Sequence, residues 1–400
     1  MPISILDPIS AAVDRALELL KPVASEFVTI GEAMGRVLAG PLCADRSSPP
    51  INVSAMDGYA VRIQDCERHS ASGQPLRVSC VARAGNSVLP LPSGEAVQIF
   101  TGAPVPPEAD CVIRREDTLE SHGQMQLNIP VASLKFGQNI RYSGENIRAG
   151  AEVLSTGTAI GSASVAALAT FGSKCVEVHR QIRVSILTSG DELVSPGEPV
   201  QPWQIRDSNS STLQSWLARL PWARVQNSSR ISDSLESTQK ALSAAVHASD
   251  AVILTGGVSA GDTDYVLPAI ESLGGQVVFH RLPIRPGKPV LVAVLGQTLV
   301  VGLPGNPVSA AVTSRVIAEP LLGRLAGLRQ SPGNLRLTLS NADDKTLNLF
   351  WYRLIRLSEF GTQLVDTQGS GDLVSLAQSD GFLEMPPGCS GSGPWRTWLW

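Results

Sequence analysis

The stretch AVILTGGVSAGDTD, residues 251–264, decides the fold class of this chain. Its first four residues are apolar, which is typical of a strand buried on both faces of a sheet. The segment that follows is small and polar, and it begins with the pair Gly256-Gly257. A buried strand that runs into such a loop is the repeating element of an open α/β sheet, in which ligands bind outside the carboxyl ends of the strands.

The same pattern recurs on both sides of this stretch. Three further apolar segments predict strands: residues 184–187, 277–279 and 299–301. A helix is predicted over residues 210–220, where four apolar side chains share one side. Strands that alternate with helices imply a parallel, doubly wound α/β sheet, which we expect to be a domain over residues 181–328.

The longest apolar run, residues 290–303, is interrupted by Gly296, Gln297 and Thr298. It predicts two buried strands joined by a tight turn, and it is too short to span a bilayer. No secretion signal is expected, because acidic residues stand where a signal peptide is basic and then apolar.

The rest of the chain differs from this α/β pattern. Residues 1–47 and 140–180 predict a helical and linker domain, with one helix that ends at Pro22 and a second over residues 31–38. Residues 48–139 alternate short β-type runs with Pro- and Gly-rich turns, which predicts a β-rich inserted domain. The final residues, 329–400, predict a small C-terminal β-barrel domain.

Composition excludes several classes of protein. The chain has 400 residues, of which 43% are hydrophobic and 17% charged, so neither a disordered chain nor a fibre fits. The net charge of −4 argues against a dedicated nucleic-acid binder. None of the 6 cysteines forms a CxxC pair, which argues against a zinc site and favours a reduced, cytoplasmic protein.

Two of the predicted strand-end loops, residues 188–192 and 255–264, are suited to an anion. Glycine allows backbone N–H groups to approach a phosphate. The carboxylates of Asp191, Glu192, Asp262 and Asp264 beside such a site favour a bridging Mg²⁺. The alternative for Asp191 and Glu192 is that they cap a helix N-terminus, where acidic residues are favoured in any case.

Two proline-stiffened segments supply positive charge and a fixed turn. The first, RLPIRPGKP at residues 281–289, carries three cations and suits a compact oxyanion. The second, GLPGNPVS at residues 302–309, turns sharply and places Ser309 near a helix N-terminus. The alternatives are a solvated surface turn for the first segment and a plain capped turn for the second.

Together these motifs resemble the molybdopterin molybdenumtransferases, the molybdenum-insertion enzymes that include the gephyrin E domain. The resemblance covers most of the chain in order. It is carried by residues 54–60, 101–106, 139–145, 188–193, 207–209, 256–265, 285–289 and 302–309.

The resemblance implies four structural domains, an elongated homodimer and an α/β domain that binds molybdopterin. It also implies the reaction: adenylylated molybdopterin and molybdate give molybdenum cofactor and AMP, assisted by Mg²⁺. Two anions must then be held close together, and unit charges 4 Å apart repel by ~4 kcal/mol at an effective dielectric of ~20. Other cofactor-biosynthesis proteins are possible partners, and neither nucleic acid nor membrane is expected to be one.

The resemblance assigns a role to individual residues. The expected catalytic residues are Asp57, Thr101, Glu192, Asp233 and Asp264, of which Asp57 and Thr101 would come from the other subunit. Molybdopterin and AMP would be bound by Ser189, Gly190, Asp207, Ser208, Gly256, Gly257, Ser259, Pro304 and Pro307. Molybdate would be bound by Arg285, Lys288, Pro289, Ser309, Arg353 and Ser370. The metal ligands would be Asp191, Glu192 and Asp264.

Three features depart from the family pattern. The family often has lysine at the position of Arg285 and an acid at that of Asn146, and the aromatic C-terminus, residues 394–400, cannot be aligned. Such an end either packs on the last domain or offers a partner surface. Alternative functions are a scaffold or binding protein on the same fold, a tungsten-inserting paralogue, a degenerate paralogue, or an enzyme that shares only the α/β module.

Overall fold

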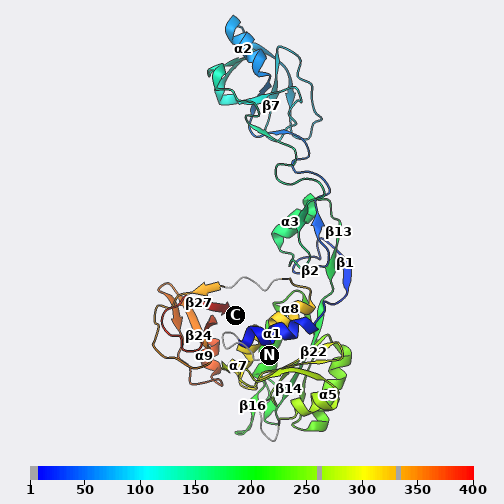
Figure 1. Cartoon of the computed structure of the whole chain (residues 1–400), viewed down its shortest axis with the longest axis vertical. Helices are drawn as coiled ribbons and strands as arrows, with labels where there is room; N and C mark the ends of the chain where they lie inside the picture. The colour runs from blue at the N-terminus through cyan, green and yellow to red at the C-terminus, as the bar shows by residue number, and fades with distance from the viewer. Residues whose placement is uncertain (1–7, 259–263, 330–334) are drawn as a thin grey trace. The chain divides into compact units, whose positions relative to one another are not determined.

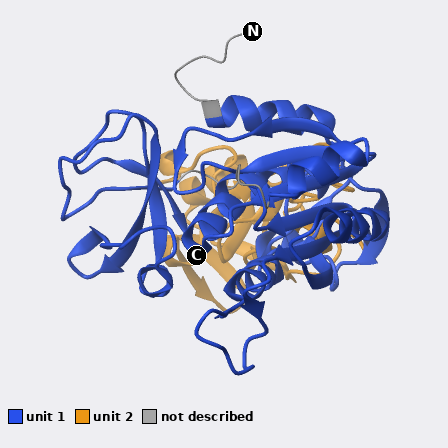
Figure 2. Cartoon of the chain, turned by 90° about the horizontal axis from the view of Figure 1, so that it is seen from below, with its two compact units in different colours: residues 1–40, 155–166, 174–400 blue, residues 41–154, 167–173 orange. Residues whose placement is uncertain are grey.

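The computed structural model describes residues 8–258, 264–329 and 335–400. The chain forms two compact units, which Figure 2 colours separately. Unit 1 comprises residues 1–40, 155–166 and 174–400, and unit 2 comprises residues 41–154 and 167–173. The four-domain division expected from the sequence is finer than these two units and stays a prediction.

A six-stranded sheet forms the centre of unit 1, with the strand order β17-β14-β18-β22-β21-β19. Its strands are β14 (Ile182–Ser189), β17 (Ala223–Ile231), β18 (Ala251–Thr255), β19 (Gln276–His280), β21 (Leu291–Leu295) and β22 (Thr298–Leu303). β17, β14, β18 and β22 are parallel, whereas β21 runs antiparallel to β22. The expected pair of strands with a tight turn is confirmed. The prediction of a parallel sheet is wrong at this edge, because a connection of two residues is too short for a crossover.

Helices cover both faces of this sheet, so the doubly wound prediction is confirmed. One face packs on α1, α4, α7 and α8, and the other on α5 and α6. Alternation along the strands divides the core: Ile186 belongs to the first face and its neighbour Leu187 to the second. Figure 1 shows α1 beside α8, in agreement with the contacts between them. The helices are α1 (Pro8–Leu19), α4 (Ser208–Ala218), α5 (Leu235–Ala248), α6 (Val266–Ser272), α7 (Pro307–Thr313) and α8 (Glu319–Leu325).

The last part of unit 1 is a small barrel. Its strands follow the order β20-β24-β26-β27-β23, and β25 pairs with the far part of β24. The ring closes where Leu339, just after β23, bridges Thr362 of β25. The elements are β20 (Ile284–Arg285), β23 (Leu335–Leu337), β24 (Phe350–Ser358), β25 (Gly361–Leu364), α9 (Leu373–Ala377), β26 (Gly381–Met385) and β27 (Trp395–Leu399).

The aromatic C-terminus packs on this barrel. The ring of Trp398 stacks on Phe382 with centroids 5.2 Å apart, and the Trp400 ring lies 5.1 Å from the same Phe382 ring. The indole N–H of Trp400 donates to Ser379 Oγ at 2.9 Å. Of the two alternatives that the sequence left open, packing on the last domain is therefore the one observed.

The N-terminal part of unit 1 contains a small sheet where the sequence predicted a second helix. A three-stranded antiparallel sheet has the order β1-β13-β2, with β1 at Ser25–Thr29, β2 at Val37–Leu38 and β13 at Cys175–His179. The helix expected over residues 31–38 is wrong, because Val37 and Leu38 pair with β13 and are fully buried there. Burial between strands outweighed a weak local helical pattern.

Unit 2 contains a second six-stranded sheet, with the order β8-β5-β7-β6-β10-β9, and helix α2 (Ile63–Ser72). Apolar side chains of this sheet form two separate clusters. Two short strand pairs, β3 with β12 and β4 with β11, complete the unit. The strands are β3 (Leu42–Cys43), β4 (Val53–Ser54), β5 (Gly58–Val61), β6 (Leu76–Ala82), β7 (Glu95–Ile99), β8 (Cys111–Arg114), β9 (Thr118–Ser121), β10 (Gln124–Leu127), β11 (Ile140–Arg141) and β12 (Glu152–Leu154). Helix α3 (Ser162–Thr170) straddles the boundary between the two units.

The structure also bears on the sequence-based expectations about membrane spans and cysteines. Within the described ranges, no helix is long and apolar enough to cross a membrane. All six cysteines lie in those ranges, and none takes part in a disulfide.

Candidate active site

The loops at the carboxyl ends of the central strands are tied together by a carboxylate. Asp233, between β17 and α5, accepts a hydrogen bond from the Ser189 hydroxyl at 2.5 Å and another from the backbone N–H of Asp191 at 3.2 Å. The backbone N–H of Asp233 in turn donates to the Asp191 carboxylate at 3.3 Å. We call Ser189, Asp191 and Asp233 the strand-end cluster. It places two carboxylates at one edge of the sheet.

A glycine turn lies against this cluster. Gly256 has φ +88°, and a Cβ there would lie 2.6 Å from the carbonyl oxygen of Ser189. A Cβ on Gly305 would lie 3.5 Å from the Cα of Gly256. The turn at Gly256 therefore approaches the Ser189 backbone more closely than a side chain would allow, and the Gly305 loop lies in ordinary contact with it. Close approach of this kind is what lets backbone N–H groups reach a ligand.

The start of helix α4 is hydrogen-bonded to the ends of three strands of the central sheet. Asp207 is the N-cap of α4, and its carboxylate accepts hydrogen bonds from Thr188 Oγ1 at 2.9 Å, Ser210 N at 3.0 Å and Ser210 Oγ at 2.6 Å. Asn209 donates to Thr255 Oγ1 at 2.8 Å and to the Gly305 carbonyl at 2.7 Å. These bonds align the ends of β14, β18 and β22.

A cavity of about 610 Å³ lies beside this edge, between the end of β22 and the barrel. All six residues expected to bind molybdate line it, and Pro304 lines it too. Pro304 also accepts a hydrogen bond from Thr255 Oγ1 at 3.1 Å, so the cavity adjoins the strand ends. The cationic segment reaches the barrel because β20 pairs in parallel with β24. The segment is a turn with exposed cations before β21, as the surface-turn alternative expects, and it also lines the cavity.

The positive charges in the cavity differ in their partners. Arg285 and Lys288 are exposed side chains, and among the described residues neither has an ion-pair partner. Arg353 is only 11% exposed and forms an ion pair with Asp343, whose carboxylate accepts from Nη1 at 2.6 Å and from Nη2 at 2.8 Å. The Arg353 guanidinium holds the pKa of Asp343 below its usual value. Arg285 and Lys288 thus supply the uncompensated charge.

The start of α7 forms another wall of the cavity. Asn306 is the N-cap, and its side-chain amide donates to Ser370 Oγ at 2.8 Å. The backbone N–H of Val308 donates to the Ser370 carbonyl at 3.0 Å. Ser309 is buried in the first turn of α7, two residues after Pro307, the first residue of the helix. The expected helix start is confirmed, and it is clamped by a barrel residue.

Two expected catalytic residues lie in unit 2, and they contact each other. Thr101 donates to Asp57 Oδ1 from its backbone N–H and from its hydroxyl, each at 2.7 Å. These two bonds lower the pKa of Asp57. Their contribution to an active site in another subunit stays a prediction.

The expected metal ligands form an incomplete set. Asp191 and Glu192 are exposed, and β15 (Leu193–Val194) follows them, so the alternative that they cap a helix is wrong. Asp264 is half-buried just before α6, whereas Ser259 and Asp262 lie outside the described residues. Within residues 8–258, 264–329 and 335–400, no three His, Cys, Asp or Glu side chains form a group able to hold a metal ion. The Mg²⁺ site stays a prediction.

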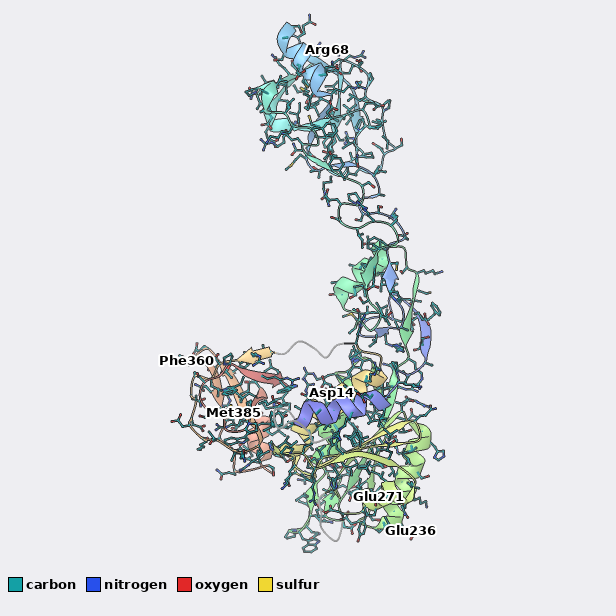
Figure 3. All side chains as sticks on the ribbon, in the orientation of Figure 1. Asp14, Arg68, Glu236, Glu271, Phe360 and Met385 are labelled. Carbon is teal, nitrogen blue, oxygen red and sulfur yellow. The ribbon has the colours of Figure 1, made fainter. Side chains whose placement is uncertain are left out.

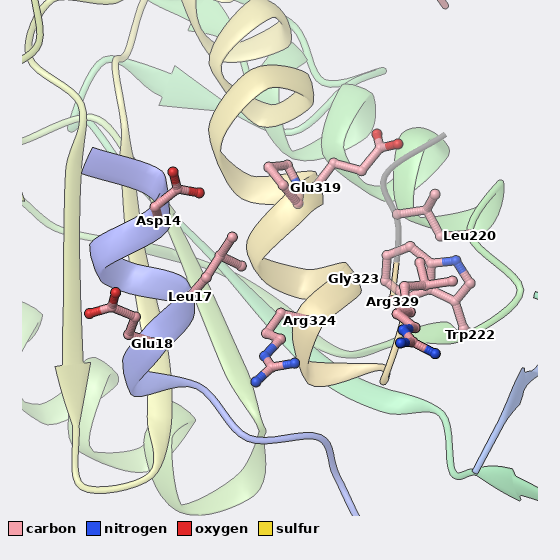
Figure 4. Close-up of a pocket in the computed structure, with 11 residues that line it drawn as sticks. Asp14, Leu17, Glu18, Leu220, Trp222, Glu319, Gly323, Arg324 and Arg329 are labelled. Atoms are coloured by element: carbon pink, nitrogen blue, oxygen red, sulfur yellow. The ribbon is translucent and has the colours of Figure 1, made fainter. Parts of the chain in front are cut away.

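Another cavity, of about 620 Å³, lies between α1 and α8 and is shown in Figure 4. Asp14 and Glu18 come from α1, and Glu319 and Arg324 from α8. No residue that the sequence assigned to the reaction lines it. Size alone therefore does not identify the site.

The sequence missed several residues of the site. The sequence predicts no role for Asn209, although it lies in one of the family motifs, and none for Asp343, Lys345 or Trp351. Lys345 and Trp351 line the cavity. Trp351 reaches it through the pairing of β20 with β24, for which a single sequence contains no signal. The departure at Asn146 is now accounted for locally: its side chain accepts from Arg141 at 2.8 Å and donates to Ser48 at 3.3 Å.

Fold and site together define a multidomain α/β protein with a cation-lined cavity at the end of its main sheet.

Comparison with known proteins extends this description. Residues 8–172 match the MoeA N-terminal region (domain I and II), and residues 185–324 match a probable molybdopterin binding domain. The molybdopterin molybdenumtransferase of Haemophilus influenzae is 37% identical over 375 residues, which are 90% of each chain. That of Synechococcus elongatus is 35% identical over 95% of each chain.

A solved structure agrees with these relatives. The molybdopterin biosynthesis moeA protein of Pyrococcus horikoshii superposes with a TM-score of 0.83, at 26% identity, over 99% of this chain and 100% of that one. The chain belongs to the molybdopterin molybdenumtransferase family. It is an enzyme of molybdenum-cofactor biosynthesis.

Proposed function

We propose that this enzyme inserts molybdenum from molybdate into adenylylated molybdopterin and releases AMP, forming molybdenum cofactor. The observation that carries the proposal is the cavity, where Arg285 and Lys288 form no ion pair with any described residue and lie with the buried Ser309 in the lining. A doubly charged oxyanion entering it meets two cations that no carboxylate of the described residues engages in an ion pair.

The strand-end loops supply the second half of the proposed site. Gly256 and Gly305 leave their backbones open to a phosphate, and Pro304 joins this edge to the molybdate cavity. An adenylylated pterin bound along these loops would hold its phosphoanhydride within reach of the oxyanion. Attack on phosphorus by water or a molybdate oxygen then breaks the phosphoanhydride bond, and AMP leaves. The protein contributes chiefly by positioning and by charge neutralisation.

The residues present fit Mg²⁺ only together with the substrate. Asp191 and Asp233 are two carboxylates held at one point by mutual backbone bonds, and Glu192 follows in the same loop. Mg²⁺ is commonly bound by one or two carboxylates, substrate phosphates and water, so a group of three protein ligands is not required. There the ion would neutralise phosphoanhydride charge. Asp264 is proposed as a further ligand.

Assembly and cellular context belong to the same proposal. We expect a cytoplasmic homodimer in which Asp57 and Thr101 of one subunit approach the cavity of the other. The exposed position of Asp57 supports this, because its carboxylate is ordered by Thr101 and yet open to a ligand. Contacts with other cofactor-biosynthesis proteins are expected on substrate transfer.

The test is molybdate-dependent AMP release from adenylyl-molybdopterin. We expect Arg285→Gln combined with Lys288→Gln to raise the KM for molybdate at least about tenfold, which corresponds to ~1.4 kcal/mol. The matched control is Lys240→Gln, which removes an exposed cation on α5 outside the cavity. Tungstate in place of molybdate measures the preference between the two oxyanions.

Two results would contradict the proposal. If AMP release did not depend on molybdate at all, the proposed reaction would be excluded and the scaffold function would be favoured. An unchanged KM for molybdate in the double variant would place the oxyanion elsewhere.

A further inference from the structure

One face of the barrel strand β24 organises the cations of the cavity. Because β20 and β24 pair in parallel, Arg285 and Trp351 are register partners. Side chains alternate along a strand, so Trp351 and Arg353, two residues apart, share a face. Phe350 and Tyr352, two buried residues of β24, point to the opposite side. The register therefore places the Trp351 indole near two guanidinium groups.

The distances agree with this placement. The Cζ of Arg353 lies 4.3 Å from the ring centroid of Trp351, and the Cζ of Arg285 lies 6.0 Å from the same centroid. Both lie within the range of cation–π attraction, which is stronger at the shorter distance. The uncharged ring of Trp351 thus attracts the guanidinium groups of both Arg285 and Arg353.

Asp343 determines which donors of Arg353 stay available. Its carboxylate accepts one hydrogen bond from Nη1 and one from Nη2, the two terminal nitrogens of the Arg353 guanidinium. A guanidinium has a second edge formed by Nε and the other hydrogen of Nη2, which also matches an oxyanion. Among the described residues, Nε of Arg353 has no hydrogen-bond partner. The Sδ of Met385, a residue labelled in Figure 3, lies 3.9 Å from Nη1, on the end already used by Asp343.

We propose that Asp343 and Trp351 are positioning residues for oxyanion binding: together they fix Arg353 so that its Nε–Nη2 edge is presented to the cavity. This inference rests on the proposed function, because it takes the cavity as the oxyanion site. It assigns the attractive charge to Arg285 and Lys288, and it makes Arg353 an orienting donor whose charge Asp343 balances.

The test is direct binding of molybdate to the full-length enzyme by titration calorimetry at constant ionic strength, together with the kinetics of AMP release. We expect Asp343→Ala to weaken molybdate binding about tenfold although it removes a negative charge next to the site. The KM for molybdate should rise by a similar factor while kcat changes less than about twofold, and Asp343→Glu should restore part of the affinity.

Variants of Trp351 test whether an aromatic face at this position is needed for molybdate binding. We expect Trp351→Phe, which keeps an aromatic face, to bind molybdate within about threefold of the parent, and Trp351→Ala to lose about tenfold. The matched control is Asp117→Ala, which breaks another two-pronged Arg–Asp pair, with Arg114, outside the cavity. Thermal unfolding of every variant identifies any loss of affinity that follows from a damaged barrel.

The outcomes distinguish this inference from the proposed function. If Arg353→Ala weakens molybdate binding but Asp343→Ala binds as the parent does or more tightly, the positioning role is overturned while the oxyanion site stands. If molybdate binds none of the proteins and AMP release does not depend on it, the proposed function itself fails.

Discussion

Thr101 directs two donors, its backbone N–H and its hydroxyl, at the same carboxylate oxygen of Asp57, each at 2.7 Å. The backbone N–H contributes more to the lowered pKa of Asp57 than the hydroxyl does. Thr101, two residues after the end of β7, therefore orients an exposed carboxylate and favours its ionised form.

The first prediction concerns this pair. Thr101→Val removes the hydroxyl donor and keeps the backbone donor, so the pKa of Asp57 should rise by less than half of the difference from its ordinary value. Carboxyl chemical shifts followed by NMR through an acid titration measure this. Thr101→Ser should restore the parent pKa. A pKa in the valine variant that is equal to the parent's would show that the hydroxyl bond is absent in solution.

The second prediction concerns stability and pH. Asp250 accepts hydrogen bonds from the guanidinium groups of Arg180 and Arg183 and from the backbone N–H of Arg183. Burial raises the pKa of Asp250, but these bonds outweigh it and hold the pKa well below its usual value. A depressed carboxyl pKa stabilises the fold above the unfolded-state pKa of ~3.9, and this stability is lost as the pH falls through the folded-state pKa.

We therefore expect Asp250→Asn to lower the free energy of unfolding by about 2 kcal/mol at neutral pH. The difference between parent and variant should shrink as the pH is lowered below about 4. Urea titrations at several pH values measure both. A difference that is constant from pH 7 to pH 2 would contradict the role assigned to the ionised carboxylate.

The third prediction concerns Gly256. Alanine there meets two penalties, a positive φ and a Cβ only 2.6 Å from the Ser189 carbonyl oxygen. We expect a loss of at least about 2 kcal/mol in the free energy of unfolding, with AMP release abolished. Gly274→Ala is the matched control: its φ is +77°, but a Cβ there meets nothing within 4 Å. Equal losses in the two variants would mean that close backbone approach adds nothing.

The fourth prediction concerns the strand-end cluster. Asp233→Asn keeps an acceptor for only one of the two groups that Asp233 binds, the Ser189 hydroxyl or the Asp191 N–H. We expect AMP release to fall at least about tenfold, with thermal stability changed little. Glu236→Gln, an exposed substitution in the first turn of α5 (Figure 3), should leave the rate unchanged. A parent-like rate in Asp233→Asn would show that the cluster does not position the substrate.

Much of the site was predictable because its parts are local in the chain. The strand 251–255 with its glycine turn, and the proline-bounded start of α7, follow from short-range rules on apolar runs, turns and helix starts. The helix expected over residues 31–38 failed for the opposite reason. Its two last residues gain more from burial in a sheet with β13 than from one weak helical turn.

The sequence by itself determined the family, the buried strands and the identities of the charged groups, since these follow from short motifs that can be recognised one by one along the chain. Only the tertiary structure decided which charges meet. Arg285 lies opposite Trp351 because β20 and β24, two strands far apart in the chain, pair in a single register. Asp343, in the segment before β24, binds one end of Arg353. Register depends on the packing of the whole barrel, and a slip of one residue would take Trp351 out of its place opposite Arg285.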